Sequence, residues 1–195
     1  MSQEPVEARK QELRAAARAL PTQGLEGASA EAQRRLLELP ELDSVGVVFL
    51  YAAAAHEVST AALAARLRAR GTRLVFPRVQ GSELRLLETK GPEDLAPGYL
   101  GMLEPSSNGA ETLPEAVDLF VVPGLLFDRA GRRLGRGGGH LDRLLGRARK
   151  DAARVGLCYA QRVVQELPAA PWDVAMHVVV TDREVIRPER PGEKA

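Results

Sequence analysis

Residues 44–79, "SVGVVFLYAAAAHEVSTAALAARLRARGTRLVFPRV", contain two apolar runs separated by a segment with the composition of a helix. The first run, residues 44–51, is short, continuous and rich in valine, which is typical of a strand covered on both faces. The segment 59–71 is rich in Ala, Leu and Arg, starts at Ser59 as the expected N-cap and ends at a glycine, so it predicts a helix. Residues 73–79 predict the next strand. This order predicts two parallel strands joined by a helix in a right-handed crossover.

The rest of the chain continues this alternation of helices and strands. We expect helices at residues 6–20, 29–39 and 139–149, a short helix near Gln161, and strands at residues 83–88, 117–123, 154–160 and 177–182. The expected fold class is α/β, with an open, mostly parallel, twisted sheet flanked by helices in a Rossmann-like three-layer arrangement. It would form one domain over residues 1–187, followed by a disordered tail at residues 188–195.

The composition excludes several classes of protein. A chain of 195 residues, 45% of them hydrophobic, is long enough for a single buried core. The net charge of +1 and the 4% of aromatic residues argue against an RNA-binding protein and against attraction to an anionic membrane. No stretch reaches the roughly 18 apolar residues of a membrane span. We expect a monomer that has neither nucleic acid nor a membrane as a partner.

The number of cysteines and the first residues of the chain indicate the cellular compartment in which we expect the protein. The single cysteine, Cys158, excludes an internal disulfide and is expected to be a buried strand thiol rather than a nucleophile. Residues 1–20 carry charges throughout and lack the apolar core and cleavage site of a signal peptide. We therefore expect a cytoplasmic protein.

A second stretch, "RRLGRGGGHLDRLL" at residues 132–145, carries the clearest functional signal. Eight basic residues lie between residues 129 and 150, where Asp142 is the one acidic residue. Glycines before a helix let backbone N–H groups approach an anion, so a phosphate site is favoured over a merely flexible loop. The spacing does not match the Walker A motif, because no Gly-Lys-Ser/Thr follows.

Other candidate residues fall near the expected ligand-binding edge, the carboxyl ends of the strands. Lys10 and Arg14 are spaced i and i+4, so they could bind one polyphosphate together or form a solvated basic helix face. Asp142 could be an ordinary acid in the first turn of a helix or a ligand of Mg²⁺. Glu57 could be a residue at a helix entry or could accept N–H donors from a heterocycle.

Taken together, these segments resemble the 5-formyltetrahydrofolate cyclo-ligase family, also called 5,10-methenyltetrahydrofolate synthetase. The family's "KxxLR" matches residues 10–14, its "gEvdT" matches "HEVST" at residues 56–60, and its long block "vPGlaFDxxGxRLGxGkGyYDxxL" matches residues 122–145. Shorter matches are Pro77 with Arg78, Glu104 with Pro105, and Asp173 with Thr181.

The resemblance implies an ATP- and Mg²⁺-dependent conversion of 5-formyltetrahydrofolate to 5,10-methenyltetrahydrofolate, and it assigns roles to residues. The residues implied to bind ATP are Lys10, Arg14, Arg133, Leu134, Gly135, Arg136, Gly137, Gly138, Gly139, His140 and Leu141. Those implied to bind the folate are Leu50, Glu57 and Arg136, of which Arg136 is also the catalytic residue that stabilises the transferring phosphoryl group. Those implied to bind the metal are Asp142 and His177.

Four positions depart from the family's pattern. Gly138 replaces a lysine, His140 and Leu141 replace two tyrosines, and His177 replaces an aspartate. The lost lysine removes a charge-assisted contact that contributes roughly 1.5–3 kcal/mol, and imidazole suits Mg²⁺ poorly. An alternative to the enzyme is therefore a non-catalytic folate- or nucleotide-binding homologue that has lost turnover. Retention of the other implied ligands favours the enzyme.

Overall fold

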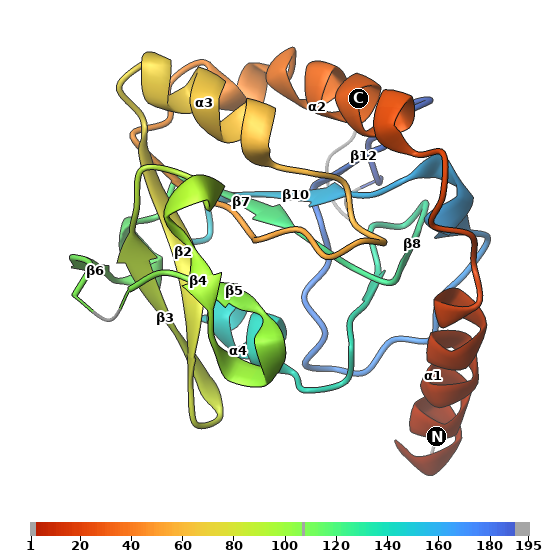
Figure 1. The fold of residues 1–195 in the computed structure, drawn as a ribbon. Coiled ribbons are helices and arrows are strands. Elements are labelled where there is room, and N and C mark those ends of the chain that lie inside the picture. The colour runs from red at the N-terminus through yellow and green to blue at the C-terminus, as the bar shows by residue number, and fades with distance from the viewer. Residues whose placement is uncertain (1–2, 107, 190–195) are drawn as a thin grey trace.

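The computed structural model describes residues 3–106 and 108–189, and its centre is an eight-stranded sheet with helices on both faces (Figure 1). The strand order is β13-β12-β10-β7-β1-β2-β3-β6. The strands are β1 (Val47–Phe49), β2 (Arg73–Gln80), β3 (Glu83–Glu88), β6 (Glu111–Thr112), β7 (Leu119–Val122), β10 (Ala153–Leu157), β12 (Val178–Val180) and β13 (Val185–Ile186). The five strands from β12 to β2 pair in parallel, whereas β13, β3 and β6 pair antiparallel at the edges. The expected open, mostly parallel sheet is confirmed.

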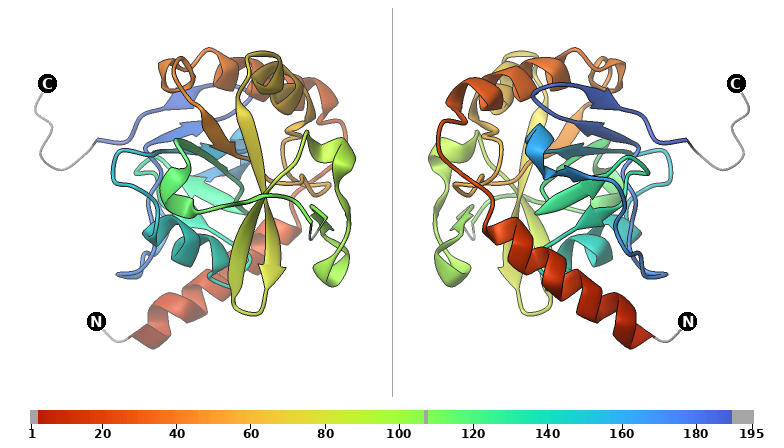
Figure 2. Two further views of the ribbon diagram at one scale, coloured as in Figure 1. Left: turned by 90° about the vertical axis from the view of Figure 1, so that its left-hand side faces the viewer. Right: turned by 90° about the vertical axis from the view of Figure 1, so that its right-hand side faces the viewer.

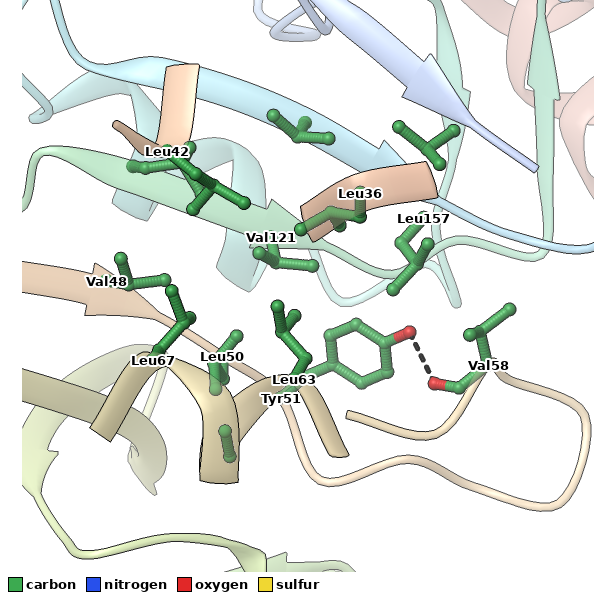
Figure 3. Packing of buried hydrophobic residues seen from close by; sticks show 14 of the residues in the cluster. Leu36, Leu42, Val48, Leu50, Tyr51, Val58, Leu63, Leu67, Val121 and Leu157 are labelled. Carbon is green, nitrogen blue, oxygen red and sulfur yellow. Dashed lines mark hydrogen bonds between the residues drawn. The ribbon is translucent and has the colours of Figure 1, made fainter. Parts of the chain in front are cut away.

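Two helices cover one face of this sheet, and a third helix covers the other. Helices α2 (Glu26–Leu37) and α3 (Ala61–Ala69) run along the upper face in Figure 1, while α4 (His140–Gly146) lies below the sheet. The side chains of each strand alternate between the two layers. In β1, Val48 packs against α2 and α3 (Figure 3), whereas Val47 and Phe49 belong to the cluster that includes the leucines of α4. The three-layer arrangement follows from this alternation.

The unit formed by β1, α3 and β2 has the expected crossover, with a shift at the start of the helix. Val47 is in register with Arg73, and the two strands are parallel. The N-cap is Thr60 rather than Ser59, so that expectation is wrong by one residue. The Thr60 hydroxyl is turned away to donate to the carbonyl of Tyr51 at 2.8 Å, which ties the helix start to the end of β1.

A small second sheet, which the sequence did not predict, supports the first helix. It has the order β11-β8-β9, with β8 at Leu126–Asp128, β9 at Arg133–Leu134 and β11 at Val163–Val164. Helix α1 (Gln3–Arg18) packs on it through Ala17 and lies at the end of the molecule opposite α2 and α3 (Figures 1 and 2). Arg162, 1% exposed, donates from Nη1 to the carbonyls of Ala17 and Leu125 at 3.3 and 3.1 Å, and so joins the end of α1 to this sheet.

The remaining elements are short. They are β4 (Ala96–Pro97), β5 (Leu103–Glu104) and the 3-10 helices at Pro40–Leu42, Pro92–Asp94, Tyr99–Gly101, Pro114–Ala116 and Ala160–Arg162. The last of these is the short helix expected near Gln161. None of the helices in the described part of the chain has both the length and the apolar character needed to cross a membrane. Of the tail expected at residues 188–195, residues 190–195 lie outside the described residues.

Cys158 follows directly after β10 and is buried, as expected. Burial raises the pKa of its thiol far above the ordinary value. A thiol that stays protonated is a poor nucleophile, so Cys158 has a packing role.

Candidate active site

A cavity of about 1160 Å³ opens where three parallel strands end. Tyr51 and Pro123, which follow β1 and β7, line it together with Pro77 of β2, which lies just beyond the last residue of β2 paired with β1. This is the edge at which parallel α/β sheets bind ligands, because the loops after successive strands meet there. The glycine segment and one face of α1 form another part of the wall.

The glycine segment lines the cavity with a backbone that requires glycine at two of its three consecutive positions. Gly137 has a φ of 110° and Gly139 a φ of 66°, values that side-chain-bearing residues rarely adopt. Gly138 lies outside this left-handed region, and a Cβ placed there would meet only the imidazole of His140, with Nδ1 at 2.6 Å. The backbone conformation therefore accounts for Gly137 and Gly139 but not for Gly138.

Lys10 and Arg14 both line the cavity from α1, and neither side chain lies on a solvated helix face. Lys10 is only 5% exposed, and its Nζ lies 2.5 Å from Oδ2 of Asp173. Arg14 donates from Nε to the carbonyl of Gly135 at 3.1 Å and pairs through Nη1 with Oε1 of Glu7 at 2.6 Å. Helix α1 is thus attached to the glycine segment by Arg14 and to the segment before β12 by Lys10.

Asp142 lies in the first turn of α4 and also lines the cavity. Its Oδ1 accepts from Nη2 of Arg133 at 2.9 Å and from the backbone N–H of Val174 at 3.4 Å. Arg133 is buried, and its Nε has no hydrogen-bond partner. The Asp142 carboxylate is therefore held by a buried cation of the cavity wall.

Glu57 occupies the opposite part of the cavity, just beyond β1. Its Oε1 lies 3.1 Å from Nη2 of Arg136, and its Oε2 accepts from the N–H of Ala54 at 2.9 Å. Arg136 belongs to the glycine segment, so this ion pair joins the two parts of the site. Nε2 of His56 lies 3.7 Å from Oε1 of Glu57, and burial, with Arg136 and Arg162 nearby, lowers the pKa of that imidazole. The lowered pKa favours the neutral imidazole, which does not compete with Arg136 for the carboxylate of Glu57.

Two of the residues implied by the resemblance do not reach the cavity. Leu50 is 0% exposed and packs among the residues beneath α2 and α3 (Figure 3), so its side chain is a core residue and Tyr51 lines the cavity instead. His177 precedes β12 at the amino end of the parallel strands, where its Nδ1 accepts from the N–H of Arg154 at 3.3 Å. The imidazole therefore lies at the edge of the sheet away from Asp142, and its assignment as a metal ligand is not supported. The other implied residues all line the cavity.

Asp173 is a site residue to which the sequence reasoning assigned no role. It lines the cavity, pairs with Lys10, and accepts from the N–H of Ala170 at 2.7 Å. The motif match at Asp173 pointed to this residue. The segment before β12 has no regular structure, however, so no periodicity indicates where the Asp173 side chain points.

The carboxylates of Asp142 and Asp173 are of the chemical type that binds a magnesium ion. No group of three or more possible ligands occurs among residues 3–106 and 108–189, which argues against a complete protein cage. Mg²⁺ needs no such cage, because one or two carboxylates with phosphate and water oxygens are its usual ligands in nucleotide sites. The two carboxylates come from α4 and the segment before β12, and each is held by a cation of the same cavity.

The fold and this cavity define an α/β protein in which a glycine-rich segment before a helix shares a cavity with the carboxylate of Glu57. Comparison with known sequences makes the class specific. The chain belongs to the 5-formyltetrahydrofolate cyclo-ligase family, whose family model matches residues 2–182.

Individual relatives and a solved structure agree with this assignment. The chain is 34% identical over 134 residues to the mitochondrial 5-formyltetrahydrofolate cyclo-ligase of Arabidopsis thaliana, covering 58% of this chain and 48% of that protein. It is 40% identical over 98 residues to the 5-formyltetrahydrofolate cyclo-ligase of Mycolicibacterium smegmatis, covering 49% of this chain and 50% of that one. The matches thus span about half the length of these two relatives. The structure of Aquifex aeolicus 5,10-methenyltetrahydrofolate synthetase superposes with a TM-score of 0.78 at 32% identity, covering 97% of this chain and 95% of that one.

Proposed function

We propose that this protein catalyses the ATP-dependent cyclisation of 5-formyltetrahydrofolate to 5,10-methenyltetrahydrofolate, with release of ADP and phosphate. The observation that carries the proposal is the 3.1 Å ion pair between Arg136 and Glu57. It supports the proposal because it joins the glycine-rich segment, the proposed phosphate site, to a carboxylate suited to the N–H donors of a pterin. Family membership supplies the reaction.

The reaction has two steps at the formyl carbon: its oxygen is phosphorylated, and N10 then attacks the carbon. The formyl oxygen attacks the γ-phosphorus of ATP, the bond from that phosphorus to ADP breaks, and the formyl carbon becomes electrophilic. N10 of the folate then attacks this carbon and loses its proton, and phosphate leaves with the former formyl oxygen. Arg136, between the two parts of the site, donates to the oxygens of the transferring phosphoryl group, while Glu57 holds the pterin.

The ion pairs seen in the cavity exchange partners when the nucleotide binds. Asp142 and Asp173 would hold Mg²⁺, which when bound neutralises phosphate charge. Lys10 and Arg133, released from these two carboxylates, then donate to phosphate oxygens. We include Mg²⁺, a monomeric state and a cytoplasmic location in the proposal as predictions from the sequence.

The second candidate function, binding without turnover, rests on Gly138. The lysine of the family is absent there, and a Cβ at this position would lie against the imidazole of His140. A direct assay separates the two functions: purified protein is mixed with 5-formyltetrahydrofolate, ATP and Mg²⁺, and methenyl formation is followed by absorbance, with a repeat in Mn²⁺. We expect turnover. Folate binding without turnover in either metal would establish the second function instead.

Restoring the missing cation is expected to strengthen nucleotide binding. Gly138→Lys should lower KM for ATP about tenfold, because a charge-assisted contact contributes roughly 1.5–3 kcal/mol and moving the His140 ring offsets part of it. The control is Gly138→Met, which has similar length and no charge. Steady-state kinetics at varied ATP measure the effect. Equal improvement by Met, or weaker binding with Lys, would show that no phosphate lies near this position.

A further inference from the structure

The single tryptophan of the sequence, Trp172, stands at the wall of the cavity and has no role in the chemistry above. It is 57% exposed, although large aromatic side chains are among those that gain most from burial. It is one of five exposed large hydrophobic residues in the described chain, and of these it and Leu103 line the cavity. An exposed indole at a ligand cavity is a surface that a ligand can cover.

The neighbours of Trp172 place it on the nucleotide side. The next residue, Asp173, pairs with Lys10 of α1, and the residue after that, Val174, donates its N–H to Asp142 of α4. The indole therefore projects from the wall that carries the phosphate-binding cations and the two carboxylates. The pterin side is formed from other elements, with Glu57 beyond β1.

The chemistry of a nucleoside triphosphate matches this distribution of groups. Its phosphates require the cations and glycine backbone of the cavity, whereas its base is a flat, uncharged ring that requires an apolar surface. Base–aromatic stacking is favourable for any base, and an indole gives the largest face of the natural side chains. Hydrogen bonds to the carboxylate of Asp173 from Lys10 and from the N–H of Ala170 hold the backbone on one side of Trp172. Because this backbone is already held, stacking on the indole costs little additional conformational entropy.

We propose that Trp172 stacks on the base of the bound nucleotide, a specificity role that rests on the proposed function for the presence of ATP. Stacking favours the wider rings, so purine triphosphates bind more tightly than pyrimidine triphosphates. Inorganic tripolyphosphate, which has the phosphates but no base, gains nothing from the indole.

A fluorescence titration tests this directly because the chain has one tryptophan. Titration with Mg²⁺ and ATP is expected to quench the indole emission to saturation, whereas tripolyphosphate at saturating concentration leaves it nearly unchanged. Quenching by both ligands to the same extent would overturn the proposal, since the indole would then be reporting closure of the cavity and not the base.

Substitution supplies the second test. Trp172→Ala is expected to weaken ATP binding about tenfold by calorimetry, Trp172→Phe less, and tripolyphosphate binding should be the same in all three proteins. Leu113→Ala removes a similarly exposed hydrophobic residue, 60% exposed, that does not line the cavity, and should change neither affinity. An unchanged ATP affinity in Trp172→Ala, or a raised KM for folate alone, would overturn the proposal.

The two proposals fail in different ways. If the protein shows no turnover but ATP quenches the indole and tripolyphosphate does not, the stacking role stands and the enzyme function falls. If turnover is normal and Trp172→Ala leaves the KM for ATP unchanged, the enzyme function stands and the stacking role falls.

Discussion

Arg136→Met is expected to lower kcat about a thousandfold while KM for ATP rises less than tenfold. The guanidinium is nearly half exposed, pairs with Glu57 at 3.1 Å and makes a weak contact from Nη1 to Sδ of Met102 at 3.9 Å, so it contributes little to the fold and is free to move toward a phosphoryl group. An arginine that meets charge developing on a transferring phosphoryl group contributes about 10³ to 10⁵ in rate. Such a contact is made mainly in the transition state, so its loss appears in kcat.

Two further variants make this measurement specific. Arg136→Lys keeps the charge but loses the two-pronged donor geometry, so it should recover only part of kcat. Arg129→Met removes a comparably exposed arginine that pairs with Glu184, outside the cavity lining, and should leave both constants unchanged. If Arg136→Met raised only the KM for folate, Arg136 would act only as the ion-pair partner of Glu57 and would not stabilise the phosphoryl group.

Lys10→Met is expected to raise KM for ATP about a hundredfold and to change kcat less. The lost charge-assisted contact with a phosphate contributes roughly 1.5–3 kcal/mol, which accounts for a change of this size. When ATP binds without Mg²⁺, the largely buried Asp173 carboxylate, left without its cation, also repels the phosphates, so metal-free ATP should lose more affinity. The variant enzyme should bind folate normally, because the proposed pterin ligand Glu57 pairs with Arg136, whereas Lys10 pairs with Asp173.

The pair can be dissected with Asp173. In the double variant Lys10→Met/Asp173→Asn, metal-free ATP binding should recover in part, because the repelling charge is gone. Lys90→Met, which removes an exposed lysine outside the cavity lining, is the control and should have no effect. If the double variant binds metal-free ATP no better than Lys10→Met, repulsion by Asp173 is not part of the effect.

The parallel strands of the central sheet could be predicted because they are apolar runs separated by helices with clear composition. The edge strands β6 and β13 and the small sheet could not, since β6, β9, β11 and β13 have two residues each, too few to show a periodicity. Boundaries were less certain for the same reason, and α4 ends at Gly146 three residues before its expected end. The extent of the single domain, residues 1–187, stays a prediction.

The candidate site was predictable where a motif fixes both residue type and position, as at Lys10, Glu57 and Arg136. Leu50 fails because side chains alternate along a strand, and its place two residues from Val48 turns it to the core beneath α2 and α3. His177 fails because a residue just before a parallel strand lies at the edge of the sheet opposite the ligand. Both errors concern where a side chain lies relative to the sheet, which the position of a residue in a motif does not specify.

The support of α1 has a consequence for how tightly the nucleotide is held. Strand β7 is buried on both faces, whereas α1 rests on a small cluster formed by Ala17, its neighbours in the small sheet and the hydrogen bonds of Arg162. We expect local opening of α1 to be less costly than global unfolding, so its amide protons should exchange with deuterium well before those of β7. Lys10 and Arg14 reach the cavity only in the closed form, so the apparent Kd for ATP equals the intrinsic value divided by the closed fraction. Nucleotide binding would then slow exchange along α1, and the affinity would depend on apolar residues that no ligand touches.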